Sequence, residues 1–220
     1  MTLDTRMARM ILDLRREGVT DTRILGAMQK VPREMFVPEA FADQAYANLA
    51  LPIGFGKTVS QPLVVALMTQ ALAPTDRMTV LEIGTGSGYQ AAVLAHLCRR
   101  LYSIERHAEL SRDAETRFKA LGLHTITAKK GDGTKGWPTH APFQRIVVTA
   151  AADGVPENLA DQLAEGGRLV VPVGPQGVDQ ELVCIERKES GFETKSMGPV
   201  RFVPLVACAP QAAAGRRGAP

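Results

Sequence analysis

A glycine-rich segment after a short apolar run is the first feature whose residue types could do chemistry. Gly84, Gly86 and Gly88 have the spacing G-x-G-x-G. Glycines permit a tight turn and let a ligand lie against bare backbone, although they also suit a plain strand-to-helix turn. Pyrophosphate-binding loops have the different spacing G-x-G-x-x-G. Glu82, just before the loop, would repel a pyrophosphate but suits a cationic amino-acid group. The loop therefore predicts a phosphate-free ligand with a positive charge.

Two more acids follow the next two apolar runs. Glu105 ends the second run, and Asp132 stands between Gly131 and Gly133 just after the third. A carboxylate in the first position can accept both hydroxyls of a ribose, and Asp132 could receive an adenine amino group. Each acid alone could be an ordinary solvated loop residue. Acids at three successive strand ends share one rim, and we expect them to bind an adenosine with a cationic tail, S-adenosylmethionine.

The segment Leu51–Pro62 is a second candidate for chemistry. It holds two glycines, two hydroxyls and an amide directly before a predicted helix N-terminus. Such a terminus offers free N–H groups and a partial positive charge, which suit a carboxylate. Ser60 could orient that ligand or simply cap the helix, and the sequence leaves both interpretations open. After the fourth strand the sequence Thr149–Asp153 lacks the Asn/Asp-Pro-Pro-aromatic tetrapeptide usual in base-methylating enzymes.

Alternating strands and helices position these residues. Helices are predicted around residues 7–14, 21–28, 62–71, 91–98, 110–121 and 156–163. Strands are predicted at residues 79–83, 101–105, 124–129, 145–149 and 168–173, followed by a hairpin of residues 181–187 and 192–195 and a last segment of residues 200–206. This order predicts a parallel sheet with right-handed crossovers. The expected fold is a doubly wound α/β sheet with an antiparallel edge and an N-terminal helical addition.

The length of 220 residues and the lack of a linker rich in Pro, Gly and Ser predict one domain over residues 1–210. Residues 1–60 would supply helices and a substrate-side loop, residues 61–180 the cofactor-binding core, and residues 181–210 the C-terminal strands. Residues 211–220 are rich in Ala and Gly and are expected to form a disordered tail.

The amino-acid composition limits which binding partners and which cellular compartment we expect for this protein. Cys98, Cys184 and Cys208 lack metal-ligand spacing and are expected to be free thiols in a reducing cytoplasm. The four histidines show no ligand pattern, so no metal is expected. A net charge of +3 is too small to indicate a nucleic-acid partner. No apolar run is long enough to span a membrane, and residues 1–16 lack the pattern of a signal peptide.

Several motifs together resemble the protein-L-isoaspartate O-methyltransferase family, and the resemblance covers nearly all of the chain. The glycine loop is common to many methyltransferases, whereas the segments around Ser60 and Pro204 are more specific. The motifs lie in the segments Val31–Val37, Ala50–Gly54, Thr58–Pro62, Leu81–Tyr89, Gly131–Gly133, Val148–Ala151, Pro172–Gly174 and Val200–Leu205. The resemblance implies a class I, Rossmann-like methyltransferase fold. It also implies methyl transfer from S-adenosylmethionine to the free α-carboxylate of L-isoaspartyl residues in damaged proteins, whose ester then closes to a succinimide.

The resemblance also implies roles for individual residues. Ser60 would be the catalytic residue, and Val59 and Val203 would line an extended peptide paired with the chain edge at Val200–Leu205. The cofactor, which leaves as S-adenosylhomocysteine, would contact Glu82, Gly84, Gly86, Gly88, Glu105, Asp132, Gly133 and Thr149. We expect a monomer that binds isoaspartyl-containing peptides and proteins.

Two positions depart from the family pattern. Gln144 replaces a usual Asp at the start of the fourth strand, away from the rim, and Asn48 replaces an Asp found in some members.

Two other functions compete with methyl transfer. The loop spacing and Glu82 oppose a nicotinamide-dependent oxidoreductase. The intact segment around Ser60 opposes a binding module that has lost turnover. A carboxylate acceptor is already ionised at neutral pH, so the predicted reaction requires no general base.

Overall fold

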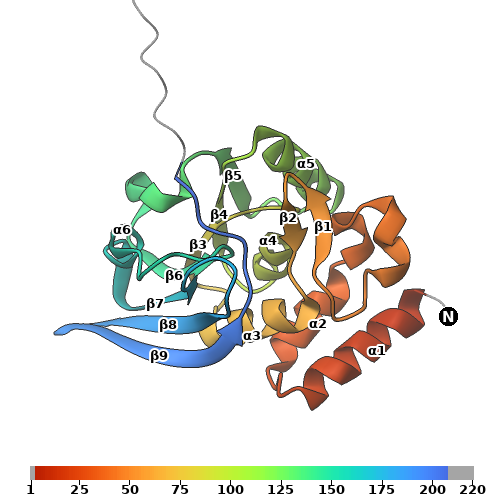
Figure 1. Cartoon of the computed structure of the whole chain (residues 1–220), viewed down its shortest axis with the longest axis horizontal. Helices are drawn as coiled ribbons and strands as arrows, with labels where there is room; N and C mark the ends of the chain where they lie inside the picture. Colours follow the sequence, from red (N-terminus) through yellow and green to blue (C-terminus); the bar gives the residue numbers. More distant parts are fainter. Residues whose placement is uncertain (1–2, 208–220) are drawn as a thin grey trace, which may run out of the picture.

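The computed structural model of the protein describes residues 3–207 (Figure 1). The predicted tail of residues 211–220 and Cys208 lie outside the described residues. The α-helices are α1 (Leu3–Arg16), α2 (Thr22–Lys30), α3 (Pro62–Leu72), α4 (Tyr89–Ala95), α5 (Ala108–Ala120) and α6 (Glu157–Ala160). The strands are β1 (Leu51–Gly54), β2 (Lys57–Val59), β3 (Thr79–Ile83), β4 (Arg100–Glu105), β5 (Ile126–Lys130), β6 (Phe143–Val148), β7 (Leu163–Val173), β8 (Gln180–Lys188) and β9 (Gly191–Val200). Short 3-10 helices are η1 (Arg33–Phe36), η2 (Glu39–Gln44), η3 (Gly133–Lys135) and η4 (Pro138–His140).

Local signals in the sequence set the ends of the N-terminal helices. The Asp21 carboxylate accepts a hydrogen bond from the Arg23 N–H at 2.8 Å and caps α2. Helix α2 ends at Lys30 because Val31 precedes Pro32 and is restricted to an extended conformation. Helix α3 begins at Pro62, as predicted.

Seven strands form the main sheet in the order β5-β4-β3-β6-β7-β8-β9. The first five strands run parallel, and β8 and β9 pair antiparallel to complete one edge. The order reverses at β3, so the loops after β3 and β6 diverge there and leave a crevice at the carboxyl ends of the strands. The predicted doubly wound α/β sheet with an antiparallel edge is confirmed.

Alternate residues of the central strands face two separate cores. Val80 of β3 and Val147 of β6 pack with α1 to α5 on one face. Leu81 and Ile146, their neighbours, pack with α6 on the other face. In Figure 1, α1 and α2 lie at one side of the molecule and the β8–β9 turn at the other. The N-terminal helices thus thicken one layer together with η1 and η2, while α6, η3 and η4 cover the opposite face.

The end of the sheet differs from the prediction in two places. Helix α6 stops at Ala160, and Leu163, which was predicted to lie on that helix, already belongs to β7. The predicted strand start at residue 168 leaves the Gly166–Gly167 pair outside the strand. The pair instead sits in a bulge, since Leu163 pairs with Phe143 and Arg168 with Arg145. Strand β9 also continues past its predicted end at residue 195 to Val200.

Gln144, one of the two departures from the family pattern, has a local structural role. Its side-chain Oε1 accepts a hydrogen bond from the Thr79 N–H at 2.8 Å. This bond ties the start of β6 to the start of β3, at the opposite end of the sheet from the glycine loop. The substitution therefore leaves the crevice untouched.

Candidate active site

The glycine loop joins β3 to α4 and places bare backbone at the crevice. All three glycines adopt positive φ, with values of 95° at Gly84, 55° at Gly86 and 94° at Gly88. A Cβ atom at Gly84 would lie 2.4 Å from the Thr149 Oγ1, so a side chain would not fit there. The loop therefore requires glycine both for its backbone conformation and for its close contact with the chain after β6.

A cavity lies against this loop, and we call it the cofactor cavity. Its walls come from the glycine loop, the end of β4, the chain after β6, the β1–β2 hairpin and the chain after β9. Its lining includes Thr58, Val59, Ser60, Ile83, Gly84, Thr85, Gly86, Glu105, Gly133, Thr149, Val203 and Leu205. Eight of the eleven cofactor and substrate residues implied by the resemblance thus line this cavity, and the three that do not are Glu82, Gly88 and Asp132.

Glu105 lies in the wall of the cofactor cavity, as predicted for a ribose contact. Its side chain is buried at 5% exposure, and its two oxygens accept the backbone N–H groups of Gly86 and His107, each at 2.9 Å. These bonds fix the carboxylate against the glycine loop. The contact with a ribose stays a prediction.

The structure places Glu82 in a different position from the one that the sequence suggested. Glu82 is fully buried beneath the loop and is not part of the cavity wall. Its Oε2 accepts a hydrogen bond from the Ser103 hydroxyl at 2.5 Å, and the Ser103 oxygen lies 2.5 Å from the Thr85 Oγ1. Burial raises the pKa of Glu82 to about 8, while the Ser103 hydrogen bond opposes that rise. Glu82 therefore supports the loop from below.

Asp132 also has a structural partner. Its Oδ1 accepts hydrogen bonds from the Thr134 N–H at 3.0 Å and the Thr134 hydroxyl at 2.7 Å, and so caps η3. The neighbouring Gly133 lines the cofactor cavity, where a Cβ atom would lie 2.4 Å from the Ile83 Cγ2. The adenine contact of Asp132 stays a prediction, whereas glycine at position 133 is required by the close packing against Ile83.

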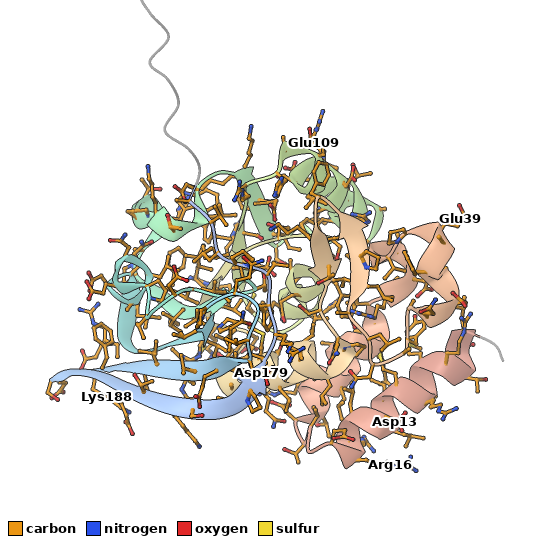
Figure 2. The ribbon with its side chains drawn as sticks, viewed as in Figure 1. Asp13, Arg16, Glu39, Glu109, Asp179 and Lys188 are labelled. Carbon is orange, nitrogen blue, oxygen red and sulfur yellow. The ribbon has the colours of Figure 1, made fainter. Side chains whose placement is uncertain are left out.

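A second cavity adjoins the first, and we call it the acceptor cavity. Its lining consists of Ala50, Thr58, Ser60, Gln61, Val64, Thr149, Asp179, Pro199, Val200, Arg201, Phe202 and Val203. Four of these residues, Thr58, Ser60, Thr149 and Val203, also line the cofactor cavity. They form a wall that both cavities share. Figure 2 labels Asp179 at the start of β8 and Lys188 at its other end, so the acceptor cavity lies away from the β8–β9 turn.

The structure separates the two interpretations of Ser60. The N-cap position of α3 is occupied by Gln61, which makes no side-chain capping bond. The Leu63 N–H, in the first turn of the helix, donates a hydrogen bond to the Asn48 Oδ1 at 3.1 Å. Ser60 is therefore not the cap of α3, and it is half-buried in the shared wall. Asn48, the second departure from the family pattern, takes the capping role.

The β1–β2 hairpin presents Ser60, whereas the sequence predicted a substrate-side loop here and no strand before residue 79. Leu51 pairs with Val59 and Pro52 with Thr58. Side chains alternate along a strand: Thr58 and Ser60 line both cavities, whereas Val59 between them is buried in the core and lines the cofactor cavity alone. Thr58 could have been found from that alternation. Val59, predicted to line the peptide, does not line the acceptor cavity.

The segment after β9 closes both cavities and is held by its own chain. The Gln180 side chain bonds both backbone groups of Phe202, at 2.6 Å to its N–H and 3.2 Å to its carbonyl. Ala151 bonds the Val203 carbonyl at 2.8 Å and the Leu205 N–H at 2.6 Å. Pro204 has no N–H. These backbone groups of Phe202, Val203 and Leu205 are therefore already bonded within the chain, and pairing of a peptide with the edge at Val200–Leu205 stays a prediction.

The described residues contain no group of three or more His, Cys, Asp or Glu side chains that could hold a metal ion. None of the helices in residues 3–207 is long and apolar enough to cross a membrane. Cys98 and Cys184 are free thiols.

The fold and the cavity at the glycine loop define a class I, Rossmann-like methyltransferase, and comparison with solved structures agrees. A protein-L-isoaspartate O-methyltransferase structure superposes with a TM-score of 0.81 over 90% of this chain at 29% identity, and the chain spans 65% of that structure's length. A Plasmodium falciparum protein assigned to the same activity, in complex with S-adenosyl-L-homocysteine, gives a TM-score of 0.79 at 24% identity. The match covers 90% of this chain and 97% of that one.

Sequence comparison identifies the family. The sequence model of the protein-L-isoaspartate(D-aspartate) O-methyltransferase family matches residues 5–209. A protein-L-isoaspartate O-methyltransferase of Paramagnetospirillum magneticum is 57% identical over 209 residues, which cover 94% of this chain and 98% of that protein. One of Rhodospirillum rubrum is also 57% identical, over 94% of this chain and 95% of that protein. The chain belongs to the protein-L-isoaspartate(D-aspartate) O-methyltransferase family.

Proposed function

We propose that this chain transfers the methyl group of S-adenosylmethionine to the free α-carboxylate of L-isoaspartyl residues in damaged proteins and peptides. The observation that carries the proposal is the wall shared by the two cavities, which contains Ser60 and Thr149. A donor on one side and an acceptor on the other would meet at this wall. Family membership supplies the identity of the donor and the acceptor.

The residues of the cofactor cavity fit S-adenosylmethionine. Gly84 and Gly133 line this cavity, and each packs so closely against a neighbouring side chain, Thr149 and Ile83 respectively, that a Cβ atom would clash there. The Glu105 carboxylate lines the cavity and would accept the ribose hydroxyls. When bound, the cofactor supplies an electrophilic methyl group on a sulfonium, and its product is S-adenosylhomocysteine. The Plasmodium neighbour, with the homocysteine form bound, supports this assignment.

The chain's contribution to the reaction is to place and orient the acceptor. A carboxylate has a pKa near ~4 in model peptides and is already ionised at neutral pH. No proton needs to be removed before an in-line displacement. Proximity and alignment of two reactants can supply on the order of 7–11 kcal/mol of the barrier. The neutral hydroxyl of Ser60 would hold one carboxylate oxygen and leave its nucleophilicity largely intact. A direct contact with a guanidinium would reduce that nucleophilicity.

The ester product accounts for the link to protein repair. The methyl ester of the isoaspartyl α-carboxylate carries a methoxide leaving group, which the free carboxylate lacks, so the neighbouring backbone nitrogen can attack the ester carbonyl, close a succinimide ring and release methanol. Hydrolysis of that ring gives some normal aspartate. We infer further that the chain acts as a cytoplasmic monomer, without nucleic acid or membrane as a partner. The free thiols of Cys98 and Cys184 are typical of a reducing compartment.

A paired-peptide assay tests the function. Labelled S-adenosylmethionine is incubated with the protein and either an isoaspartyl peptide or its aspartyl twin of the same sequence. We expect base-labile methylation of the isoaspartyl peptide, followed by a succinimide visible by mass spectrometry, and little methylation of the twin. The twins carry equal charge and differ in where one backbone methylene lies. Comparable rates on both peptides would contradict the proposal.

A further inference from the structure

Arg33 is a fully buried cation directly behind the shared wall. It begins η1, in the segment Val31–Val37 that the sequence analysis singled out without assigning it a role, and its exposure is 0%. Its Nη2 donates to the Ser60 carbonyl and its Nε to the Ala45 carbonyl, each at 2.7 Å. Its guanidinium carbon lies 4.4 Å from the centre of the Tyr89 ring, which lines the cofactor cavity. Arg33 thus touches both the backbone of Ser60 and the wall of the cavity beside it.

No carboxylate neutralises this charge within residues 3–207, since Arg33 forms none of the ion pairs found there. The adjacent Glu34 instead accepts the Tyr46 hydroxyl at 2.5 Å. Burial lowers the pKa of Arg33, but a guanidinium stays protonated in proteins. Burying an unpaired cation is strongly unfavourable, and the Tyr89 face and two carbonyls compensate it only in part. A binding partner with a negative charge would complete the compensation.

We propose that Arg33 is a positioning residue for the acceptor: it fixes Ser60 through its carbonyl and supplies the positive charge that attracts the substrate carboxylate. The proposal rests on the proposed function, because it assigns the missing negative charge to the isoaspartyl α-carboxylate. The donors of Arg33 that face Ser60 and Ala45 are occupied by carbonyls. The charge therefore acts through the Ser60 peptide, and the carboxylate keeps its nucleophilic lone pairs.

A role limited to packing predicts something different. If Arg33 only braces Ser60, its loss should weaken binding of any peptide in the acceptor cavity to the same extent. If its charge acts on the carboxylate, the loss should depend on whether the peptide carries that carboxylate. The α-carboxamide analogue of the isoaspartyl peptide has the same shape without the charge. Comparing the two peptides therefore separates the two roles.

The test compares Arg33→Gln, which removes the charge but keeps an N–H donor, with Arg33→Lys, which keeps the charge. Dissociation constants of both peptides are measured by calorimetry with S-adenosylhomocysteine present. We expect Arg33→Gln to weaken binding of the isoaspartyl peptide by about tenfold or more and of the carboxamide by less than about twofold. Arg33→Lys should retain the preference for the charged peptide. Equal losses for both peptides, or no loss, would overturn the proposal.

Arg145→Gln is the matched control. Arg145 is also buried, at 8% exposure, and bonds the carbonyls of Ala73, Gln144 and Gly166, but, unlike Ser60, none of these residues lines either cavity. The Arg145→Gln variant should be less stable than the unaltered protein but should keep the same preference for the isoaspartyl peptide over its carboxamide analogue.

A measurement on the unaltered protein covers the case in which Arg33→Gln does not fold. The pKa of a 13C-labelled isoaspartyl α-carboxylate, followed by NMR in the complex, should lie below its value in the free peptide, and a higher value would overturn the proposal. Unaltered protein that binds neither peptide would instead contradict the proposed function itself.

Discussion

Replacing Ser60 with alanine removes a hydroxyl that holds no backbone N–H of α3. The capping bond comes from Asn48, and Arg33 bonds the Ser60 carbonyl, which alanine keeps. The change in the free energy of unfolding should therefore stay within about 0.5 kcal/mol, as for a substitution that leaves caps and core intact. The hydroxyl should matter for the reaction, because one preorganised hydrogen bond in a site shielded from water contributes on the order of a hundredfold in rate. That factor corresponds to about 2.7 kcal/mol of barrier.

Asn48→Ala provides the opposite perturbation. It removes the acceptor for the Leu63 N–H, which should lower the free energy of unfolding by about 0.5–2 kcal/mol. Asn48 lines neither cavity, so turnover by the folded protein should be retained. Denaturant unfolding gives the stability of both variants. Labelled methyl transfer to an isoaspartyl peptide gives kcat, and calorimetry gives the affinity for S-adenosylmethionine, which Ser60→Ala should leave nearly unchanged.

The reasoning is refuted if the two variants exchange their effects. A Ser60→Ala protein that turns over at a near-normal rate would show that the hydroxyl does not orient the acceptor. A Ser60→Ala protein that loses about 1 kcal/mol or more of stability would restore its role as a cap.

Two further predictions concern the carboxylates near the glycine loop. Glu105→Ala should weaken S-adenosylmethionine binding by on the order of 1–3 kcal/mol, because it leaves the N–H groups of Gly86 and His107 without their acceptor and removes the ribose contact; unchanged affinity by calorimetry would refute the assignment. Glu82 has a folded-state pKa of about 8, above its ordinary value of 4.5. Its protonated form therefore favours the folded state fully below about pH 4.5, and this contribution is lost as the pH rises to about 8. Denaturant unfolding across this window should show that the free energy of unfolding falls less steeply with rising pH for Glu82→Gln than for the unaltered protein. If the two proteins show the same pH dependence, Glu82 does not titrate in this window.

The order of strands and helices could be predicted because each central strand is an apolar run bounded by polar residues or glycine. The bulge at Gly166–Gly167 could not be predicted in the same way. A glycine pair signals a break in a single chain, and only the neighbouring strand reveals that pairing resumes on both sides of it. The β1–β2 hairpin was missed for a similar reason. Its strands have only 4 and 3 residues, which is too short for an alternating pattern to be recognised in the sequence.

The candidate site was predicted in part. Glu105, Gly84 and Gly133 were placed correctly in the cavity wall, because their positions follow from strand ends and backbone space. Glu82 was misplaced, since side chains of successive strand residues point to opposite faces and the sequence did not fix which face was open. The capping role of Asn48 depends on a contact between residues 15 positions apart in the chain. No local pattern predicts such a contact.

The two hydrogen bonds between the Gln180 side chain and the Phe202 backbone affect the entropy of ligand binding in both cavities. The segment of residues 201–207 forms part of both cavity walls but belongs to no strand. Irregular wall segments usually become ordered when a ligand binds, which reduces affinity. Here the Phe202 and Leu205 amides are already bonded to Gln180 and Ala151, and they should exchange with solvent as slowly as amides in the sheet. This wall is therefore ordered before any ligand arrives, and binding needs no further loss of chain entropy there.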